Sequence, residues 1–254
     1  MTLRVVISGA SSGLGLALAQ HYLQNGAHVA AYARRAEPLE KLSAQYPGKV
    51  SCYPLDVCDA AALHAAAHDF IKRVGVPDIV IANAGVSHGT LTDYAEDIDA
   101  FQEVLNTNVV GVVKTFQPYM SALRQAGSGT LVGIASVAGF RGLPGSEAYS
   151  ASKAALISYL ESLRIELRGS GVGVVTLCPG FIKTPMTDIN PYPMPFILQV
   201  DDAARRMARI IAARRSFAVV PWQMAIVGYV LKRLPNCLFD LAFSKARLKP
   251  RKQK

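Results

Sequence analysis

The sequence predicts an α/β protein with three layers, in which a doubly wound parallel sheet is covered by helices on both faces. Two features of the 254 residues predict it: about seven short apolar runs recur along the chain, and longer Ala-rich segments with helical period separate them. The runs are nearly continuous rather than alternating, which is typical of strands buried on both faces. Regular alternation of strand and helix favours right-handed crossovers and a seven-stranded parallel sheet.

The predicted strands are rich in β-branched residues, and they are Leu3–Ser8, His28–Ala33, Val50–Leu55, Asp78–Ala82, Gly129–Ala135, Val172–Cys178 and Ser216–Val220. The main predicted helices between them are Leu14–Asn25, Ala60–Arg73, Asp97–Arg124, Ala148–Arg168 and Asp201–Arg215. No low-complexity linker or further repeat interrupts this order. The simplest organisation is one domain over residues 1–254, with an insertion around 186–200 that contains the Pro-rich segment Asn190–Phe196.

Positive charge is concentrated at the end of the chain. The formal net charge is +9, and six cations in the tail 245–254 account for most of it: Lys245, Arg247, Lys249, Arg251, Lys252 and Lys254. We interpret this tail as a solvated, frayed terminus, the usual state of a short basic end. The alternative is binding to an anionic membrane or to nucleic acid. Without those six charges the remaining net charge is only +3, so we expect no nucleic-acid partner, and peripheral membrane contact is the minor alternative.

The cysteines indicate a reducing compartment. Cys52, Cys58, Cys178 and Cys237 form no CxxC pair or Cys/His cluster of the zinc type. We expect reduced thiols in a cytoplasmic protein. The first residues lack the pattern of a secretory signal, and the longest apolar stretch, Phe217–Leu231, is too short to cross a bilayer.

No metal site is expected. His64 and His68 have helical i,i+4 spacing, but no third ligand accompanies them, and a solvated helix face is the favoured interpretation.

A glycine-rich loop follows the first predicted strand and leads directly into a helix. Its candidate binding residues are Gly9, Ser11, Ser12, Gly13, Leu14 and Gly15, with the spacing GxxxGxG. Glycines permit a tight turn and let backbone N–H groups and the helix N-terminus approach a pyrophosphate. An ordinary strand-to-helix turn is the alternative, although the position between strand and helix favours a nucleotide-binding loop.

The end of the second strand bears on the choice of cofactor. A carboxylate there would bond the ribose hydroxyls of NAD and repel a 2′-phosphate, but the run ends in Ala33, Arg34 and Arg35. The Arg34 guanidinium offers a planar fork suited to a phosphate, so NADP(H) is preferred over NAD(H). The alternative is that Arg34 and Arg35 are solvated loop charges.

Polar residues also follow later strands. Asp56 and Val57 follow the third strand, and Asn83, Ala84 and Gly85 follow the fourth. Each group alone is an ordinary strand-end turn, but ligands of doubly wound sheets bind at the carboxyl ends of the strands.

Tyr149 and Lys153 are four residues apart in a predicted helix, so their side chains lie on one face. An exposed i,i+4 pair is the alternative for this motif alone. Two further residues favour a reacting centre: Ser136 ends the fifth strand, and Asn108 lies in the preceding helical stretch.

Together these motifs, from Ser8 to about Met186, resemble the short-chain dehydrogenase/reductase family, whose members have about 250 residues and the GxxxGxG and YxxxK elements. The resemblance implies a Rossmann fold with one dinucleotide-binding and catalytic domain, and a tetrad of Asn108, Ser136, Tyr149 and Lys153. It also implies that Asp56 and Val57 flank the adenine and that Asn83, Ala84 and Gly85 line the cofactor. Oligomerisation through the helices predicted at 97–124 and 148–168 is implied as well, as a homodimer or homotetramer.

The same resemblance implies a role for each member of the tetrad. Ser136 holds the substrate oxygen, Tyr149 exchanges the proton, Lys153 bonds the nicotinamide ribose, and Asn108 holds a water that links Lys153 to solvent. Free tyrosine has a pKa of about 10, so we expect the ammonium and the oxidised nicotinamide ring to lower the pKa of Tyr149. The family's PGxxxTxM element matches here, and its cofactor-binding members are Pro179, Gly180, Ile182 and Thr184.

The predicted activity is interconversion of a carbonyl and an alcohol by hydride transfer. The alternative from another class is a catalytically idle NADP(H)-binding sensor or scaffold. An epimerase of related fold is disfavoured by the loop spacing, and a serine hydrolase by the lack of a GxSxG elbow. The Pro-rich segment Asn190–Phe196 either favours an apolar carbonyl substrate or covers the core. The section Pro221–Leu248 contacts a subunit, the substrate or a membrane surface.

Overall fold

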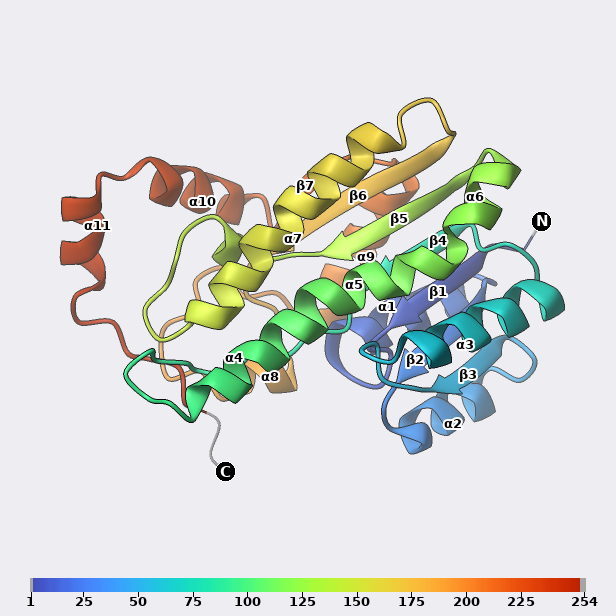
Figure 1. The fold of residues 1–254 in the computed structure, drawn as a ribbon, viewed down its shortest axis with the longest axis horizontal. Coiled ribbons are helices and arrows are strands. Elements are labelled where there is room, and N and C mark those ends of the chain that lie inside the picture. Colours follow the sequence, from blue (N-terminus) through green and yellow to red (C-terminus); the bar gives the residue numbers. More distant parts are fainter. Residues whose placement is uncertain (1, 252–254) are drawn as a thin grey trace.

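A seven-stranded parallel sheet forms the centre of the computed structural model, which describes residues 2–251 (Figure 1). Its strands are β1 (Arg4–Ser8), β2 (His28–Ala33), β3 (Val50–Pro54), β4 (Ile79–Ala82), β5 (Gly129–Ile134), β6 (Val172–Pro179) and β7 (Phe217–Val220). The spatial order is β3-β2-β1-β4-β5-β6-β7, which confirms the predicted doubly wound architecture. The direction of winding reverses between β1 and β4, and the crevice at such a switch point is the usual ligand site.

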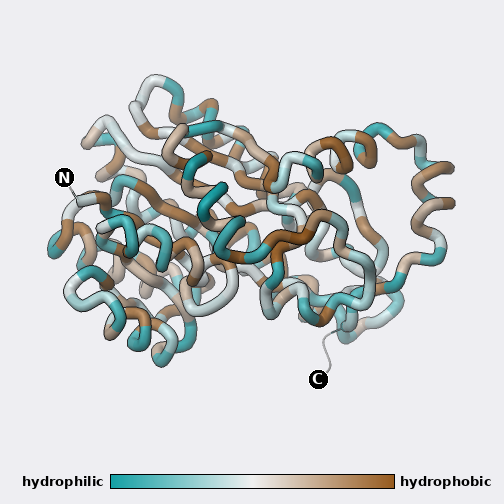
Figure 2. The backbone as a smooth tube through the Cα atoms, turned by 180° about the vertical axis from the view of Figure 1, so that it is seen from behind, coloured by the Kyte–Doolittle hydropathy of each residue, from teal (hydrophilic) through white to brown (hydrophobic). Residues whose placement is uncertain are grey.

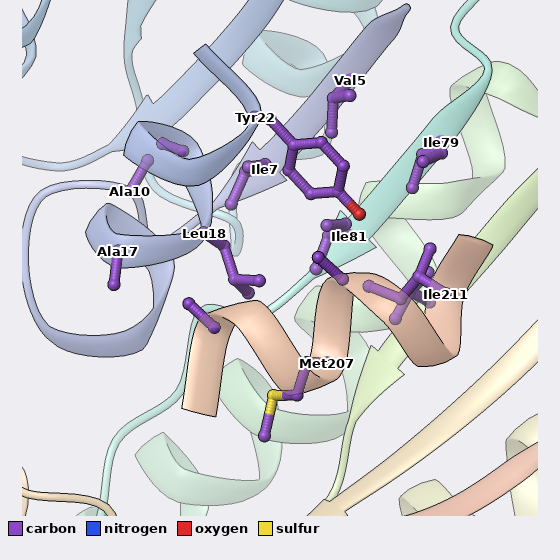
Figure 3. Close-up of a cluster of buried hydrophobic side chains, with 14 of the residues drawn as sticks. Val5, Ile7, Ala10, Ala17, Leu18, Tyr22, Ile79, Ile81, Met207 and Ile211 are labelled. Atoms are coloured by element: carbon purple, nitrogen blue, oxygen red, sulfur yellow. The ribbon is translucent and has the colours of Figure 1, made fainter. Parts of the chain in front are cut away.

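Helices cover both faces of the sheet. One face carries α1 (Gly13–Gln24), α2 (Ala36–Gln45) and α9 (Val200–Ala212), and the other carries α3 (Ala60–Arg73), α5 (Gly111–Phe116) and α7 (Glu147–Glu166). In Figure 3, Leu18 of α1 and Met207 and Ile211 of α9 gather over Ile7 and Ile81 of the sheet. Full burial of such a side chain contributes about 1.5–3 kcal/mol. This packing fixes the N-terminus of α1 beside the carboxyl end of β1.

The helix predicted over Asp97–Arg124 is interrupted in the structure. It divides into α4 (Asp97–Leu105), the π-helical turn η1 (Asn106–Val110), α5, the 3-10 turn η2 (Gln117–Tyr119) and α6 (Met120–Ala126). Pro118 lacks a backbone N–H, which accounts for the break at η2. The wider turn η1 contains Asn108, and π-turns inside helices occur frequently at functional sites.

The C-terminal part extends sideways from the sheet as α10 (Gln223–Arg233) and α11 (Asn236–Phe243), and the chain then returns toward α4 (Figure 1). Apolar segments run along both helices in Figure 2. Several of their large side chains are exposed, among them Trp222 and Leu241, whose exposed fractions are 64% and 74%. Among the described residues, no helix has both the length and the apolar character needed to cross a membrane.

The basic tail is only partly the solvated terminus that the sequence suggested, because Lys245 and Arg247 are exposed whereas Lys249 and Arg251 are held by the protein. Lys249 is buried, and its Nζ donates a hydrogen bond to Ser87 Oγ at 2.8 Å. Arg251 pairs with Asp97 at 2.8 Å and with Glu96 at 2.9 Å. For residues 249 and 251 the interpretation was wrong, because Ser87 and the carboxylates at the start of α4 bind these two cations from segments far away in the sequence. Lys252 and Lys254 lie outside the described residues.

Candidate active site

The loop between β1 and α1 brings backbone close to backbone. Gly9 has φ +71°, a conformation that favours glycine, and an added Cβ would lie 2.9 Å from Ala84 Cα. A Cβ on Gly15 would lie 2.2 Å from the Gly9 carbonyl oxygen. The first turn of α1 contains no acidic residue, and Ser12 makes no side-chain cap there. The helix therefore presents backbone donors and a positive dipole end at this loop, which suits an anionic pyrophosphate.

Asn83 joins the ends of β1 and β4 beneath this loop. Its Nδ2 donates to the Ser8 carbonyl at 3.0 Å, while the backbone N–H groups of Asn83 and Ala84 both donate to Ser8 Oγ at 3.1 Å. Asn83 thus has a structural role at the crevice that the sequence motif alone predicted only in part.

A cavity of about 500 Å³ lies along the carboxyl ends of the strands, and we name it the glycine-loop cavity. All the residues predicted to bind the cofactor line it: Gly9, Ser11, Ser12, Gly13, Leu14, Gly15, Arg34, Arg35, Asp56, Val57, Asn83, Ala84, Gly85, Tyr149, Lys153, Pro179, Gly180, Ile182 and Thr184. Thr107, Ile134 and Thr187 line it as well, although no motif singled them out.

The charges around this cavity are uneven. Arg34 and Arg35 are exposed at its rim, just after β2, and Asp56 is the only carboxylate among the residues that line it. Asp56 follows β3, and its Oδ1 accepts a hydrogen bond from the Cys58 N–H at 2.9 Å. No carboxylate stands at the end of β2, where it would repel a 2′-phosphate.

Lys153 and Tyr149 lie together in the first turns of α7. Lys153 is 5% exposed, and its Nζ donates to the Ile134 carbonyl at 2.8 Å. The same nitrogen lies 5.6 Å from the centre of the Tyr149 ring. Burial lowers the pKa of Lys153 to about 8, so the ammonium stays protonated in neutral solution but loses its proton far more readily than a surface lysine.

The expected lowering of the Tyr149 pKa is not found in the protein alone. Burial raises the pKa of this phenol, and its hydrogen bond with Ser136 opposes the rise only in part. The expectation counted the positive charges near the phenol but not the cost of moving a phenolate out of water. A tyrosine in this setting stays protonated and can donate its proton.

Ser136 stands where β5 ends, with extended backbone angles (φ −171°, ψ 156°). Its Oγ accepts a hydrogen bond from the Ala138 N–H at 3.1 Å. The hydroxyl remains next to Tyr149, and both residues line the glycine-loop cavity.

Asn108 is the one tetrad member whose side chain does not line that cavity. Its Oδ1 accepts from the Val86 N–H at 2.8 Å, and its Nδ2 donates to the Val86 carbonyl and to Ser152 Oγ at 2.9 Å and 3.1 Å. Both amide donors are therefore used within the protein. The side chain ties η1 to the loop after β4 and to α7, which is a positioning role, and the water contact of Asn108 stays a prediction.

A second and larger cavity, of about 740 Å³, adjoins the first, and we name it the apolar cavity. Its walls come from the loop after β5, the segment 186–195, α10 and the chain after α11, with large apolar contributions from Phe140, Phe181, Tyr192, Met224, Leu231 and Phe243. Ser136 and Tyr149 line both cavities. The two spaces therefore adjoin at these residues, together with Gly180, Met186 and Thr187, which also line both.

The apolar cavity bears on two choices that the sequence left open. Tyr192, Pro193 and Pro195 of the Pro-rich segment line it, so this segment covers a cavity and not merely the core. The residues that flank this segment are joined by a hydrogen bond, which the Leu198 N–H donates to the Phe181 carbonyl at 2.9 Å. The section 221–248 also lines the cavity, through residues such as Val227 and Leu231.

Sequence reasoning missed Lys249 and Ser87, which lie on the wall of the apolar cavity. Lys249 Nζ is 5.9 Å from the centre of the Tyr149 ring. No local motif could have indicated this, because residues 87, 149 and 249 meet only through the fold. Among residues 2–251, no group of three or more His, Cys, Asp or Glu residues is placed to hold a metal ion.

Comparisons with known proteins agree with this geometry. Residues 4–191 match the family model described as short chain dehydrogenase. An uncharacterized oxidoreductase of Myxococcus xanthus is 40% identical over 245 residues, covering 95% of this chain and 96% of that protein. A 3-oxoacyl-[acyl-carrier-protein] reductase of Thermotoga maritima is 35% identical over 192 residues, covering 73% of this chain and 76% of that protein.

Solved structures give the same result. An alcohol dehydrogenase from the archaeon Thermococcus sibiricus, complexed with 5-hydroxy-NADP, superposes with a TM-score of 0.77 at 25% identity, covering 87% of this chain and 96% of that one. The match of the family model over most of the chain, the full-length relative and the shared architecture lead to one conclusion. The chain belongs to the short-chain dehydrogenase family of oxidoreductases.

Proposed function

We propose that this oxidoreductase reduces a carbonyl compound to an alcohol with NADPH, in a reaction that is reversible with NADP⁺. The observation that carries the proposal is the meeting of the two cavities at Ser136 and Tyr149. A ligand in the glycine-loop cavity and a second ligand in the apolar cavity would therefore have their reacting ends beside the same two hydroxyl groups.

The glycine-loop cavity fits a dinucleotide. Backbone donors at the start of α1 would hold the pyrophosphate, and the lack of Cβ atoms at Gly9 and Gly15 keeps the backbone there closely packed. Arg34 at the rim would bond the 2′-phosphate of NADP(H), which supports a preference over NAD(H). The alcohol dehydrogenase complexed with 5-hydroxy-NADP is a relative that binds the phosphorylated form.

When bound, the nicotinamide supplies the hydride that reaches the carbonyl carbon. Negative charge then develops on the substrate oxygen, which Ser136 holds by a hydrogen bond and Tyr149 neutralises by donating its phenolic proton. Lys153, held against the Ile134 carbonyl, stabilises the resulting phenolate and bonds the nicotinamide ribose. In the direction of oxidation the same phenolate accepts the proton of the alcohol.

The walls of the apolar cavity support a substrate with an apolar body. The 3-oxoacyl-[acyl-carrier-protein] reductase of Thermotoga maritima shows that a relative acts on such a carbonyl. A catalytically idle NADP(H) sensor or scaffold is the less favoured alternative, because a protein that only binds the dinucleotide needs no second cavity beside Tyr149.

The test is a spectrophotometric screen of purified protein with NADPH and NADH against ketones, aldehydes, quinones and acyl thioesters. We expect Tyr149→Phe to bind NADPH as the unaltered protein does and to reduce carbonyls on the order of 100-fold more slowly, the usual worth of a positioned acid. Undiminished reduction by this variant would refute the role of Tyr149. Tight NADPH binding without turnover of any carbonyl class would favour the sensor.

We further propose that the enzyme works as a homodimer or homotetramer in the cytoplasm. The helices expected to meet a second copy carry exposed apolar residues, among them Ile98, Val113 and Ile165, and all four cysteines are free thiols. Sedimentation analysis of the protein and of Ile165→Glu tests the assembly, and a monomer in both cases would refute it.

A further inference from the structure

We propose that Lys249 binds an oxyanion group of the substrate, so that the preferred substrate is an apolar carbonyl compound with a carboxylate-type group close to the carbonyl. This inference rests on the proposed carbonyl reduction and adds the chemical class of the substrate. It assigns a binding role to the chain after α11, which carries none of the motifs discussed above.

The first argument is the environment of Lys249. The residue is 6% exposed, and its ammonium, which has three donors, makes one hydrogen bond with the described residues, to Ser87 Oγ at 2.8 Å. The Ser87 hydroxyl is a neutral partner, and Lys249 forms no ion pair with a carboxylate among the described residues. The positive charge of Lys249 is therefore not balanced by a neighbouring carboxylate. Burial accordingly lowers the pKa of Lys249 to about 8. An incoming anion would supply both the missing charge and the missing acceptors.

The second argument is the charge of the apolar cavity as a whole. Four cations line it, namely Arg141, Lys245, Arg247 and Lys249, and none of the residues that line it is Asp or Glu. The Arg141 guanidinium is held by neutral acceptors, among them the Leu231 carbonyl at 2.9 Å. Arg247 donates to the Pro191 carbonyl at 3.2 Å. A cavity whose charges all have one sign attracts ligands of the opposite sign.

The third argument is that the chain is built to bring Lys249 inward. Gly89 donates its N–H to the Pro250 carbonyl at 3.0 Å, and a Cβ at Gly89 would lie 2.3 Å from the Lys249 carbonyl oxygen. A Cβ at Gly145 would lie 2.9 Å from Leu248 Cβ. At the end of the segment, Arg251 Nε donates a hydrogen bond to Asp97 at 2.8 Å, and the Arg251 Cζ lies 3.4 Å from the centre of the Tyr94 ring. The segment 248–251 is thus held on both sides of Lys249, which fixes the ammonium in the cavity wall.

The position of the ammonium limits where the anion sits in the substrate. Lys249 Nζ lies 5.9 Å from the centre of the Tyr149 ring, close to the 5.6 Å of Lys153 Nζ. Lys153 lines the glycine-loop cavity, whereas Lys249 lines the apolar cavity. An anion on Lys249 therefore lies near the carbonyl that Tyr149 protonates, and the apolar remainder of the substrate extends toward α10 and α11.

A matched pair of substrates tests this directly in the intact enzyme. The pair is 4-oxodecanoate and its methyl ester, which share the carbonyl and the chain and differ in charge. We expect the acid to be reduced with a higher kcat/KM than the ester. In Lys249→Met, which keeps the unbranched apolar stem of the side chain and removes the charged end, kcat/KM for the acid should fall about 10- to 100-fold, the worth of a charge-assisted hydrogen bond. The kcat/KM of Lys249→Met for the methyl ester should change little.

Two further variants act as controls. Lys249→Arg keeps the charge and should retain most of the preference for the acid. Lys232→Met removes an exposed charge of α10 that does not line the apolar cavity and should change the preference by less than about threefold. The NADPH dissociation constant of each variant shows that the fold and the glycine-loop cavity are intact.

The inference is overturned if the unaltered enzyme reduces acid and ester equally well, a result that needs no variant. It is also overturned if Lys249→Met slows both substrates to the same degree, because Lys249 would then be structural, or if Lys232→Met has the same effect as Lys249→Met.

A binding measurement separates this inference from the proposed function. Calorimetry on the protein saturated with NADP⁺ compares decanoate with methyl decanoate, and neither needs to react. If no carbonyl is reduced but decanoate binds more tightly than its ester and loses this advantage in Lys249→Met, the oxyanion-binding role of Lys249 holds and the proposed function fails. If ketones are reduced but decanoate has no advantage, the proposed function holds and the inference fails.

Discussion

The two cavities that meet at Tyr149 are built in opposite ways. The glycine-loop cavity is lined largely by short segments directly after the strands, such as residues 9–15 after β1 and 83–85 after β4. The apolar cavity is lined by segments that leave the sheet and return, including 186–195, α10 and the chain near Lys249. The sheet therefore determines the shape of the glycine-loop cavity, and packing between segments that are distant in the sequence determines the shape of the apolar cavity.

The two kinds of construction suit two kinds of ligand. Backbone groups at strand ends have little freedom, since parallel pairing fixes them, and they suit a ligand that does not vary. Segments outside the sheet can change without disturbing the strands, and they suit a substrate that differs between relatives. The predictions below test whether the two regions are energetically as separate as the geometry indicates.

The largest expected effect is on the glycine-loop cavity. Gly15→Ala places a Cβ 2.2 Å from the Gly9 carbonyl oxygen, so the loop must shift and NADPH should bind on the order of 100-fold more weakly. The matched control is Gly142→Ala, since a Cβ there meets nothing within 4 Å. Fluorescence titration with NADPH measures both variants, and equal dissociation constants for the two would contradict the close packing at Gly15.

The next effect concerns the rim of the same cavity. Arg34→Asp replaces the proposed phosphate-binding fork with a carboxylate, so the dissociation constant of NADPH divided by that of NADH should rise about 10- to 100-fold. Lys41→Asp makes the same change of charge in α2, where Lys41 pairs with Glu37 in solvent. A shift of the ratio in Lys41→Asp as large as that in Arg34→Asp would mean that net charge, and not the fork at the rim, selects the cofactor.

A third effect follows from the buried ammonium of Lys153. Its pKa of about 8 in the protein alone lies below the usual 10.5, and the charged form is the one that we propose binds the cofactor. Above pH 8 the protein must take up a proton to bind NADPH, so the dissociation constant should rise by up to about tenfold per pH unit. Lys153→Met should abolish this dependence, whereas Tyr149→Phe should keep it. A dissociation constant that is flat between about pH 7 and pH 9.5 would contradict the role of Lys153.

The smallest effect should appear only in the apolar cavity. Arg251→Gln removes the ion pairs with Asp97 and Glu96 and loosens the segment that carries Lys249, so KM for the carbonyl substrate should rise about two- to fivefold. The NADPH dissociation constant should stay the same. Arg73→Gln, which breaks an exposed pair with Asp69 on α3, is the control and should change neither quantity. A weaker affinity for NADPH in Arg251→Gln would show that the two cavities are coupled.

The sheet and the groups around the glycine-loop cavity could be predicted from the sequence because their signals are local. A run of apolar residues followed by Gly9 or Asn83 predicts both the strand and the turn after it. Because the strands are parallel, all such ends meet at one edge, and the residues predicted to bind the cofactor do lie together there.

The remaining features depend on tertiary contacts that no short pattern records. The inward position of Lys249 depends on Ser87, Gly89 and Asp97, which are more than 150 residues away. The pKa of Tyr149 depends on how deeply the phenol is buried, and the spacing of Tyr149 and Lys153 does not reveal this. The π-turn at Asn108 changes which partners its amide reaches, although the helical period of the segment continues through it.

The close approach of Gly89 and Gly145 to the segment 248–251 also has a consequence for redesign. This segment packs on glycines and contributes no strand to the central sheet. The stretch 223–251, which we name the C-terminal cassette, therefore lies at one side of the molecule. Exchanging that cassette between relatives that keep both glycines would transplant selectivity for the carbonyl compound while leaving the choice of dinucleotide unaltered.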